Sequence, residues 1–213
     1  MRALISAAQR PDYPATIVLV LANRPTAQGL VFARECNIAT AVIDHTIYRQ
    51  RADFERAMQM MLALHRVELI CLAGFMRILS EGFVRAWHGR MVNIHPALLP
   101  AYKGLHTHER ALHDGVRVHG CTAHFVISDI DSGPIIAQAA VPVCDGDTPA
   151  SLAARVIAQE HIIYPLALDL VASGRVEIAG NRAKILAPLR EPAALIVPSL
   201  ADTTVAAARS SPS

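Results

Sequence analysis

Aromatic and charged residues are both scarce in this sequence of 213 residues. Phe, Trp and Tyr make up 5% of it and Asp, Glu, Lys and Arg 18%, whereas hydrophobic residues make up 53%. This composition excludes a disordered chain and predicts a large core of Ala, Val, Ile and Leu. The 20 basic residues nearly cancel the 18 acidic ones, so the net charge of +2 gives no electrostatic reason to expect a nucleic-acid partner.

Long apolar runs and paired cysteines are also missing. No run approaches the roughly 20 residues that a membrane-spanning helix needs, and residues 1–15 contain no apolar core of a signal peptide. Cys36, Cys71, Cys121 and Cys144 stand far apart without a CxxC motif, which is typical of isolated thiols in a reducing compartment. We therefore expect a soluble cytoplasmic protein with no membrane partner.

Glycine motifs that cradle nucleotide phosphates are absent. No two of the 11 glycines lie within four positions of each other, and neither GxGxxG nor a Walker P-loop occurs. The sequence therefore argues against a nicotinamide-dependent dehydrogenase and against an NTPase.

Short aliphatic runs alternate with helical stretches in the first half of the chain. The runs predict buried strands, and the stretches between them, rich in helix formers, predict helices near 28–35, 53–64 and 81–87. This alternation predicts an α/β fold with an open, doubly wound, mostly parallel sheet. Such sheets bind ligands beyond the carboxyl ends of their strands. The expected strands are residues 16–22, 39–43, 68–73 and 91–95.

The second half has a different pattern. Strands are expected at residues 122–127 and 135–141, and the short link between them favours an antiparallel pair. Thr148 followed by Pro149 predicts the start of a long helix that continues to about residue 172. A small hairpin is expected within 175–186. We expect a catalytic domain over residues 1–187 and a loose tail, rich in Ala, Pro and Ser, over 188–213.

Polar side chains accumulate where two strands end. Asn93 and His95 are two positions apart, so their side chains point to the same side of a strand, and Asp131 lies in the turn between the antiparallel strands. An Asn can donate to a developing oxyanion, a His can donate or move a proton, and a nearby Asp can fix that imidazole. With no adjacent Ser or Cys nucleophile, the set suits direct attack of a substrate amine on an acyl group. Capping of backbone groups is the alternative interpretation.

The ten histidines raise a metal-site hypothesis. His106 and His108 form an HxH motif and His113 lies further along, but no HExxH and no suitable set of Cys, Asp or Glu accompanies them. On a helix, His106 and His108 would face different directions. We therefore expect no bound metal and a capping or packing role for these residues.

Several longer motifs resemble the phosphoribosylglycinamide formyltransferase family. The similarity covers most of the chain from about residue 3 to about residue 187, and it implies the family's Rossmann-like fold. It also implies formyl transfer from 10-formyltetrahydrofolate to glycinamide ribonucleotide in purine biosynthesis, with no metal. The motifs are LAGFMRILS at 72–80, VNIHPALLP at 92–100, GLHTH at 104–108, HGCTAHFV at 119–126 and DSGPIIAQ at 131–138, with QEH at 159–161 and YP at 164–165.

The resemblance also implies roles for individual residues. It makes Asn93, His95 and Asp131 the catalytic trio, with His124 supporting the same pocket. The ribonucleotide would be held by Ile157, Ala158, Gln159 and Glu160, with the Glu160 carboxylate accepting from ribose hydroxyls. The folate co-substrate would be bound by Arg51, by Met76, Arg77, Ile78 and Leu79, by Asn93, and by Ile127, Ser128, Asp129, Ile130 and Asp131.

The chain departs from the family at its start. Family members open with a hydrophobic strand and a Gly-Ser-Asn loop that binds the substrate phosphate, whereas residues 3–5 already match the first helix. That strand is central in a doubly wound sheet, so we expect residues 16–22 to lack one hydrogen-bonding neighbour. A start codon assigned too far downstream is the simpler explanation, and adaptation is the alternative.

Other functions stay open on the sequence alone. Formyltetrahydrofolate hydrolase has a similar fold and similar residues but carries an extra N-terminal domain. Methionyl-tRNA formyltransferase needs a basic C-terminal RNA-binding domain, whereas the only basic residues in 187–213 are Arg190 and Arg209. A folate-binding remnant without activity is the third alternative. We expect small-molecule substrates, no nucleic acid, and a monomer or weak homodimer.

Overall fold

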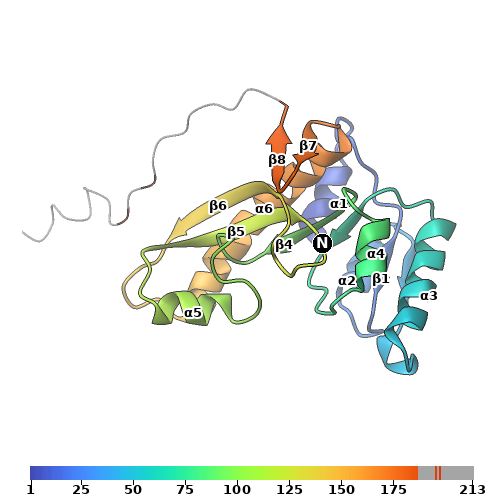
Figure 1. Ribbon diagram of the computed structural model, residues 1–213, viewed down its shortest axis with the longest axis horizontal. Coiled ribbons are helices and arrows are strands. Elements are labelled where there is room, and N and C mark those ends of the chain that lie inside the picture. Colours follow the sequence, from blue (N-terminus) through green and yellow to red (C-terminus); the bar gives the residue numbers. More distant parts are fainter. Residues whose placement is uncertain (187–194, 196, 198–213) are drawn as a thin grey trace, which may run out of the picture.

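The computed structural model describes residues 1–186, 195 and 197, and within them helices and strands alternate as the sequence predicts (Figure 1). The expected tail at 188–213 falls outside the described residues apart from those two positions. The helices are α1 (Arg2–Ala8), α2 (Gly29–Glu35), α3 (Arg51–Leu64), α4 (Glu81–Ala86), α5 (Thr107–His113) and α6 (Pro149–Ala172), with a 3₁₀ turn at His45–Ile47. The strands are β1 (Val20–Ala22), β2 (Thr40–Val42), β3 (Ile70–Leu72), β4 (Met91–His95), β5 (Val118–Phe125), β6 (Ile135–Pro142), β7 (Val176–Ala179) and β8 (Arg182–Ile185).

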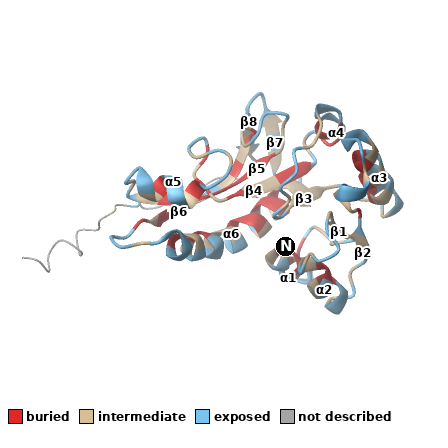
Figure 2. Ribbon diagram, turned by 90° about the horizontal axis from the view of Figure 1, so that it is seen from below, coloured by how far each residue is buried: buried red, intermediate tan, exposed pale blue. Residues whose placement is uncertain are grey.

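The larger sheet has the order β3-β4-β5-β6 and carries the core. β3 and β4 are parallel, whereas β4–β5 and β5–β6 are antiparallel, which confirms the expected α/β fold and its antiparallel second half. α6 lies along one face of this sheet (Figure 2), and its buried residues Leu152, Val156 and Leu168 share a hydrophobic cluster with strand residues. The expected hairpin is present as β7–β8.

The long helix α6 begins where Thr148 and Pro149 predict. The Thr148 hydroxyl accepts from the backbone N–H of Ser151 at 3.2 Å, and the Ser151 hydroxyl accepts from the N–H of Thr148 at 3.0 Å. This reciprocal capping satisfies two backbone donors at the helix start. Further along, the Tyr164 hydroxyl lies 2.7 Å from the carbonyl of Leu72 and 3.1 Å from that of Val92, so α6 is joined to the last residue of β3 and to the first half of β4.

β1 and β2 form a separate two-stranded parallel sheet. Among the described residues β1 pairs only with β2, which confirms the expectation that residues 16–22 lack one hydrogen-bonding neighbour. A cavity of about 610 Å³ lies between β1 and β3 and is lined by residues 14–23 on one side and 66–75 on the other. The sheet is therefore interrupted between these two parallel edges.

The prediction of a strand across all of residues 16–22 was wrong in extent. Only Val20–Ala22 is a strand, and residues 16–19 carry no ladder to a neighbour. A hydrophobic run becomes a strand only where a second strand satisfies its backbone groups, and on the β3 side of this run none is present among the described residues. β3 is shortened in the same way, to Ile70–Leu72.

No helix in the described part of the chain is both long enough and apolar enough to cross a membrane.

The interrupted sheet predicts an alternating pattern of amide exchange. The N–H groups of Val20 and Ile70 donate toward β2 and β4. Because successive N–H groups of a strand point to opposite sides, those of Leu21 and Cys71 face the cavity and have no hydrogen-bond partner among the described residues. We expect Leu21 and Cys71 to exchange at least about tenfold faster than Val20 and Ile70, because unpaired amides exchange without local opening. Residue-resolved hydrogen exchange by NMR measures this, and equal protection on both sides of each strand would mean that the open edges are covered in solution.

Candidate active site

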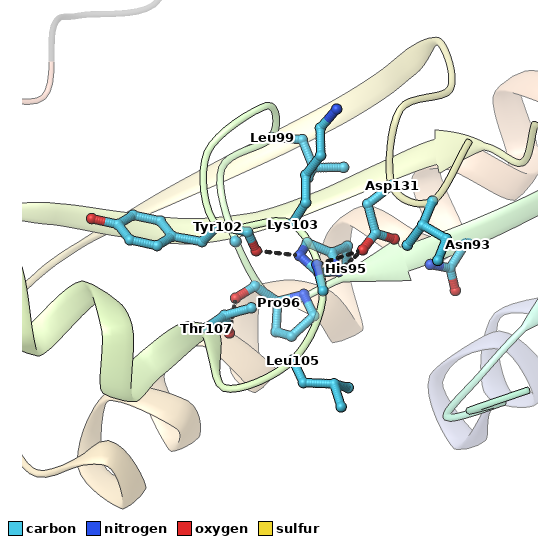
Figure 3. Close-up of polar contacts among 12 residues, drawn as sticks. Asn93, His95, Pro96, Leu99, Tyr102, Lys103, Leu105, Thr107 and Asp131 are labelled. Carbon is cyan, nitrogen blue, oxygen red and sulfur yellow. Dashed lines mark hydrogen bonds and ion pairs between the residues drawn. The ribbon is translucent and has the colours of Figure 1, made fainter. Parts of the chain in front are cut away.

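Asn93 and His95 lie on β4, the strand between parallel β3 and antiparallel β5. In the β4–β5 register Asn93 lies opposite His124, and His95 lies opposite Thr122. Asp131 belongs to the turn between β5 and β6, and this turn brings its carboxylate between His95 and Asn93 (Figure 3). The structure therefore brings the three predicted catalytic side chains, and the supporting His124, to one place.

The Asn93 amide is oriented by His124. The Nδ1 of His124 lies 2.8 Å from the carbonyl oxygen of Phe125, which can only accept, so Nδ1 carries the proton. The other nitrogen, Nε2, then accepts from the Asn93 amide nitrogen at 3.3 Å. Burial lowers the pKa of His124, which favours this neutral form. One N–H of the Asn93 amide is used in this contact, and the second remains to donate to a ligand.

His95 is fixed on both sides of its ring. Its Nε2 lies 2.9 Å from the carbonyl oxygen of Tyr102 and donates to it, while Nδ1 lies 3.4 Å from Asp131 Oδ2. A proton on Nδ1 turns this second contact into a charge-assisted hydrogen bond. The same Oδ2 accepts from the Gly104 N–H at 2.9 Å, which fixes the carboxylate as well.

The turn that carries Asp131 depends on a close backbone approach. Asp131 has a positive φ of 49°, a conformation that Asp tolerates better than most residues. A Cβ at Gly133 would lie 1.8 Å from the carbonyl oxygen of Phe125, so only glycine allows the turn to come this close to β5.

The segment after β4 is held against the sheet by hydrogen bonds. The Leu99 N–H donates to the Thr122 hydroxyl at 3.0 Å, and the Gln138 amide donates to the Leu99 carbonyl at 2.9 Å. The Arg110 guanidinium donates to the Lys103 carbonyl at 2.7 Å. Tyr102 and Gly104 therefore contact the site through their backbone groups.

The predicted folate residues form two loops at the same edge of the sheet. Met76, Arg77, Ile78 and Leu79 lie in the loop after β3, and this loop starts beside Asn93 because Leu72 pairs with Asn93. Arg51, the first residue of α3, donates to the Ile78 carbonyl at 3.4 Å. The second loop holds Ile127, Ser128, Asp129 and Ile130, and the Val126 before it shares a hydrophobic cluster with Leu79.

The residues predicted to hold the ribonucleotide lie on α6 and are only partly brought together. Glu160 lines a small cavity of about 150 Å³ with Gly74, Ile94 and Tyr164, and burial raises the pKa of its carboxyl group. Gln159 is half-buried, whereas Ile157 and Ala158 are exposed and do not line this cavity.

Sequence reasoning missed the backbone contacts of the site. The Tyr102 carbonyl and the Gly104 N–H each contact a catalytic side chain. Every residue has these groups, so no residue type marks them. The one available signal was Gly104, whose φ of 79° suits glycine in a tight turn.

The HxH histidines do not converge. His106 is exposed and lies 3.7 Å from Glu109, whereas His108 turns inward and its ring centre lies 5.3 Å from that of His119. In the described part of the chain no group of three or more His, Cys, Asp or Glu side chains is placed to hold a metal ion.

His119 is a buried imidazole whose ring nitrogens make no well-formed hydrogen bond within the described residues. Its side chain is 1% exposed, and neither ring nitrogen has a hydrogen-bond partner among the described residues. Burial, reinforced by the neighbouring His108, lowers the pKa of His119 to about 4. The residue is therefore neutral at pH 7 and resists protonation.

This burial predicts a loss of stability in acid. The pKa of His119 falls from about 6.5 in the unfolded chain to about 4 in the folded one, so the unfolded state binds more protons between these values. The contribution of His119 to stability is complete above pH 6.5 and is lost as the pH falls toward 4. We expect His119→Phe, which keeps an aromatic ring but cannot be protonated, to lose less stability over this interval than the wild type. Guanidinium unfolding at pH 7, 6, 5 and 4.5 measures this, and parallel pH profiles would contradict it.

Comparisons with known proteins identify the family of this chain. The family model described as formyl transferase matches residues 1–168. The chain is 42% identical to phosphoribosylglycinamide formyltransferase of Escherichia coli over 183 residues, which cover 86% of each protein. It is 49% identical over 181 residues to the human trifunctional purine biosynthetic protein adenosine-3, covering 85% of this chain but only 18% of that longer protein.

Solved structures give the same result. Glycinamide ribonucleotide transformylase 1 of Symbiobacterium toebii superimposes with a TM-score of 0.85 at 42% identity, covering 87% of this chain and 88% of the other. Phosphoribosylglycinamide formyltransferase of Coxiella burnetii superimposes with a TM-score of 0.82 at 44% identity, with 87% of each chain covered. With most of its length matched by the family model and by these relatives, the chain belongs to the formyl transferase family.

Proposed function

We propose that this chain transfers a formyl group from 10-formyltetrahydrofolate to the amine of glycinamide ribonucleotide, a step of purine biosynthesis. The observation that carries the proposal is the grouping of Asn93, His95 and Asp131 around one point at the sheet edge, in a member of the formyl transferase family. The 86% mutual coverage with the Escherichia coli enzyme of this name supports the choice of substrates.

The chemistry is direct attack without a covalent enzyme intermediate. The substrate amine attacks the formyl carbon, a new C–N bond forms, and the carbonyl oxygen becomes an oxyanion. The free N–H of Asn93 and the protonated His95 stabilise this charge, which develops only as the transition state is approached. The bond between the formyl carbon and N10 of the folate then breaks.

Proton movement is the task of His95 and Asp131. The attacking amine must lose a proton and the departing N10 must gain one, so the transfer is balanced within the site. The protonated His95 gives its Nδ1 proton to the departing N10, and the same atom, 3.4 Å from Asp131, then takes the proton that the amine loses. The Asp131 carboxylate stabilises the imidazolium and returns it to the same orientation after each transfer.

The two substrates approach along different walls. The folate would lie between the loop of Met76, Arg77, Ile78 and Leu79 and the turn of residues 127–131, with Arg51 near its carboxylate end. Exposed Met76, Ile78 and Ile130 offer apolar contact to its rings. The ribonucleotide would be held on the α6 side by Glu160, with Ile157, Ala158 and Gln159 completing that wall.

The proposal includes the setting of the enzyme. The catalytic unit spans residues 1–187, works in the cytoplasm as a monomer or weak homodimer, and needs no nucleic acid, membrane or metal.

A product assay separates transfer from hydrolysis: formylated ribonucleotide forms only when glycinamide ribonucleotide is present, whereas a hydrolase releases formate without it. If this chain gave only formate, or no turnover, the proposed function would be wrong.

The catalytic trio predicts losses in kcat. We expect His95→Ala and Asp131→Asn each to lower kcat by at least about 10²-fold, because both remove stabilisation that exists only in the transition state. Binding of the folate should change little. His113→Ala, which removes an exposed imidazole outside the site, is the matched control and should keep wild-type kcat. Near-wild-type turnover by either site variant would exclude that residue from catalysis.

Activity should not depend on a divalent cation. Oriented hydrogen bonds and proton transfer account for every step, so no step needs a Lewis acid. We expect full kcat after dialysis against EDTA, measured in buffer treated with chelating resin. Loss of activity on dialysis with recovery on adding Zn²⁺ would overturn the mechanism.

A further inference from the structure

Glu55 is an acidic side chain buried beneath the loop that follows β3. It lies on α3, is 6% exposed, and forms no ion pair with any described residue. A buried carboxylate is costly unless its oxygens are hydrogen-bonded. The hydrogen-bond partners of Glu55 therefore indicate the role of its carboxylate.

Both carboxylate oxygens of Glu55 accept hydrogen bonds from one residue, Ser80. The Ser80 N–H donates to Oε1 at 2.6 Å, and the Ser80 hydroxyl donates to Oε2. That hydroxyl also accepts from the Phe83 N–H at 3.2 Å as the N-cap of α4. Ser80 is thereby fixed in position, orientation and rotamer.

Ser80 is the last residue of the loop that the folate proposal uses. Residues 73–80 have no regular secondary structure, and Met76 and Ile78 are 77% and 64% exposed, so packing restrains the middle of this loop little, although Phe75 and Leu79 pack against a hydrophobic cluster. Its first end is fixed by β3, and its second end by Glu55. Between them Arg51 donates to the Ile78 carbonyl.

Arg51 and Glu55 act from one face of α3. They are four residues apart, so their side chains are neighbours on the helix surface. Arg51 reaches the loop at Ile78 and Glu55 reaches it two residues later, at Ser80. The helix therefore holds the loop by two charged side chains, and only the buried one makes a bidentate contact.

We propose that Glu55 is a positioning residue for the folate co-substrate, because its buried carboxylate fixes residues 76–79 in the conformation that forms the folate wall. This inference rests on the proposed function. Glu55 does not touch the substrate; it acts through Ser80. The loop stays anchored only while the carboxylate accepts both hydrogen bonds.

The alternative is a clamp between α3 and α4 with no bearing on the folate. A clamp and a positioning residue both affect stability, so stability does not separate them. The KM values for the two substrates separate the two roles. A positioning residue on the folate wall changes the KM for 10-formyltetrahydrofolate and leaves the KM for glycinamide ribonucleotide unchanged.

The test uses the full chain and four variants: Glu55→Ala, Glu55→Gln, Ser80→Ala and the Glu55→Ala/Ser80→Ala double variant. We expect Glu55→Ala to raise the KM for the folate at least about tenfold, the size that follows from losing hydrogen bonds to a charged group. The KM for the ribonucleotide and kcat should stay within about twofold. Glu55→Gln, which keeps an acceptor for the Ser80 N–H, should lie between Glu55→Ala and wild type. Asp53→Asn is the matched control, since it alters a half-exposed carboxylate on the same helix that pairs with Arg56 and not with the loop.

Coupling and proteolysis provide further readouts. Because the two residues act through each other, the double variant should raise the folate KM no more than the worse single variant. Trypsin cleavage after exposed Arg77 should be faster in Glu55→Ala than in wild type, which reports anchoring of the loop without any substrate.

Failure of the inference differs from failure of the proposed function. Equal rises in both KM values, or a lower melting temperature with both KM values unchanged, would overturn the positioning role. If wild type shows no formyl transfer, the proposed function fails, and the Kd of tetrahydrofolate by calorimetry then decides the role of Glu55. An unchanged Kd in Glu55→Gln and Ser80→Ala would overturn it. The same two variants decide the question if Glu55→Ala does not fold.

Discussion

The pairing of β4 with β5 is the constraint on which the site depends. It sets Asn93 opposite His124 and His95 opposite Thr122, so that one register fixes two reactive side chains and their supports together. A slip of one residue would turn Asn93 and His95 to the other face of the sheet, toward α6. The register is held from outside the pair as well, because Thr122 and Gln138 bind the backbone of Leu99 and so fix the segment that follows β4. The reactive side chains are thus placed by backbone pairing, and side-chain contacts with the backbone support it.

Local patterns of the sequence predicted most of the fold and the centre of the site. The alternation of aliphatic runs and helices, the capping residues Thr148 and Pro149, and the spacing of Asn93 and His95 are all local signals, and the structure agrees with them. The extent of β1 was mispredicted because it depends on a neighbouring strand and not on the run itself. The roles of the Tyr102 carbonyl and the Gly104 N–H were hidden because backbone groups carry no residue signature. Glu55 was hidden because an acidic residue in a helix is usually solvated, and only the fold shows that it is buried.

The interrupted sheet and the site lie close together. β3 is the last strand before the cavity and also the strand whose following loop carries Met76 and Ile78. Because one edge of β3 has no neighbouring strand among the described residues, the sheet restrains this loop less. The hydrogen bonds from Arg51 and Glu55 of α3 therefore contribute more to its position. Tyr164 adds a second restraint by bonding the Leu72 carbonyl where the loop starts. The position of the loop of residues 73–80 is therefore restrained by both α3 and α6, two helices far apart in the sequence.

One carboxylate, Asp131, lies among several imidazoles whose hydrogen bonds differ. His108, His119 and His124 have their pKa values lowered, each chiefly by burial, and so remain neutral. Asp131 lies 3.8 Å from His124 Nε2, but that nitrogen already accepts from Asn93 and is not free to hold a proton. At His95 the arrangement is reversed, since Nε2 donates to a carbonyl and Nδ1 faces the carboxylate. The Asp131 carboxylate therefore faces a ring nitrogen of His95 that is not used elsewhere, whereas the buried imidazoles around it stay neutral.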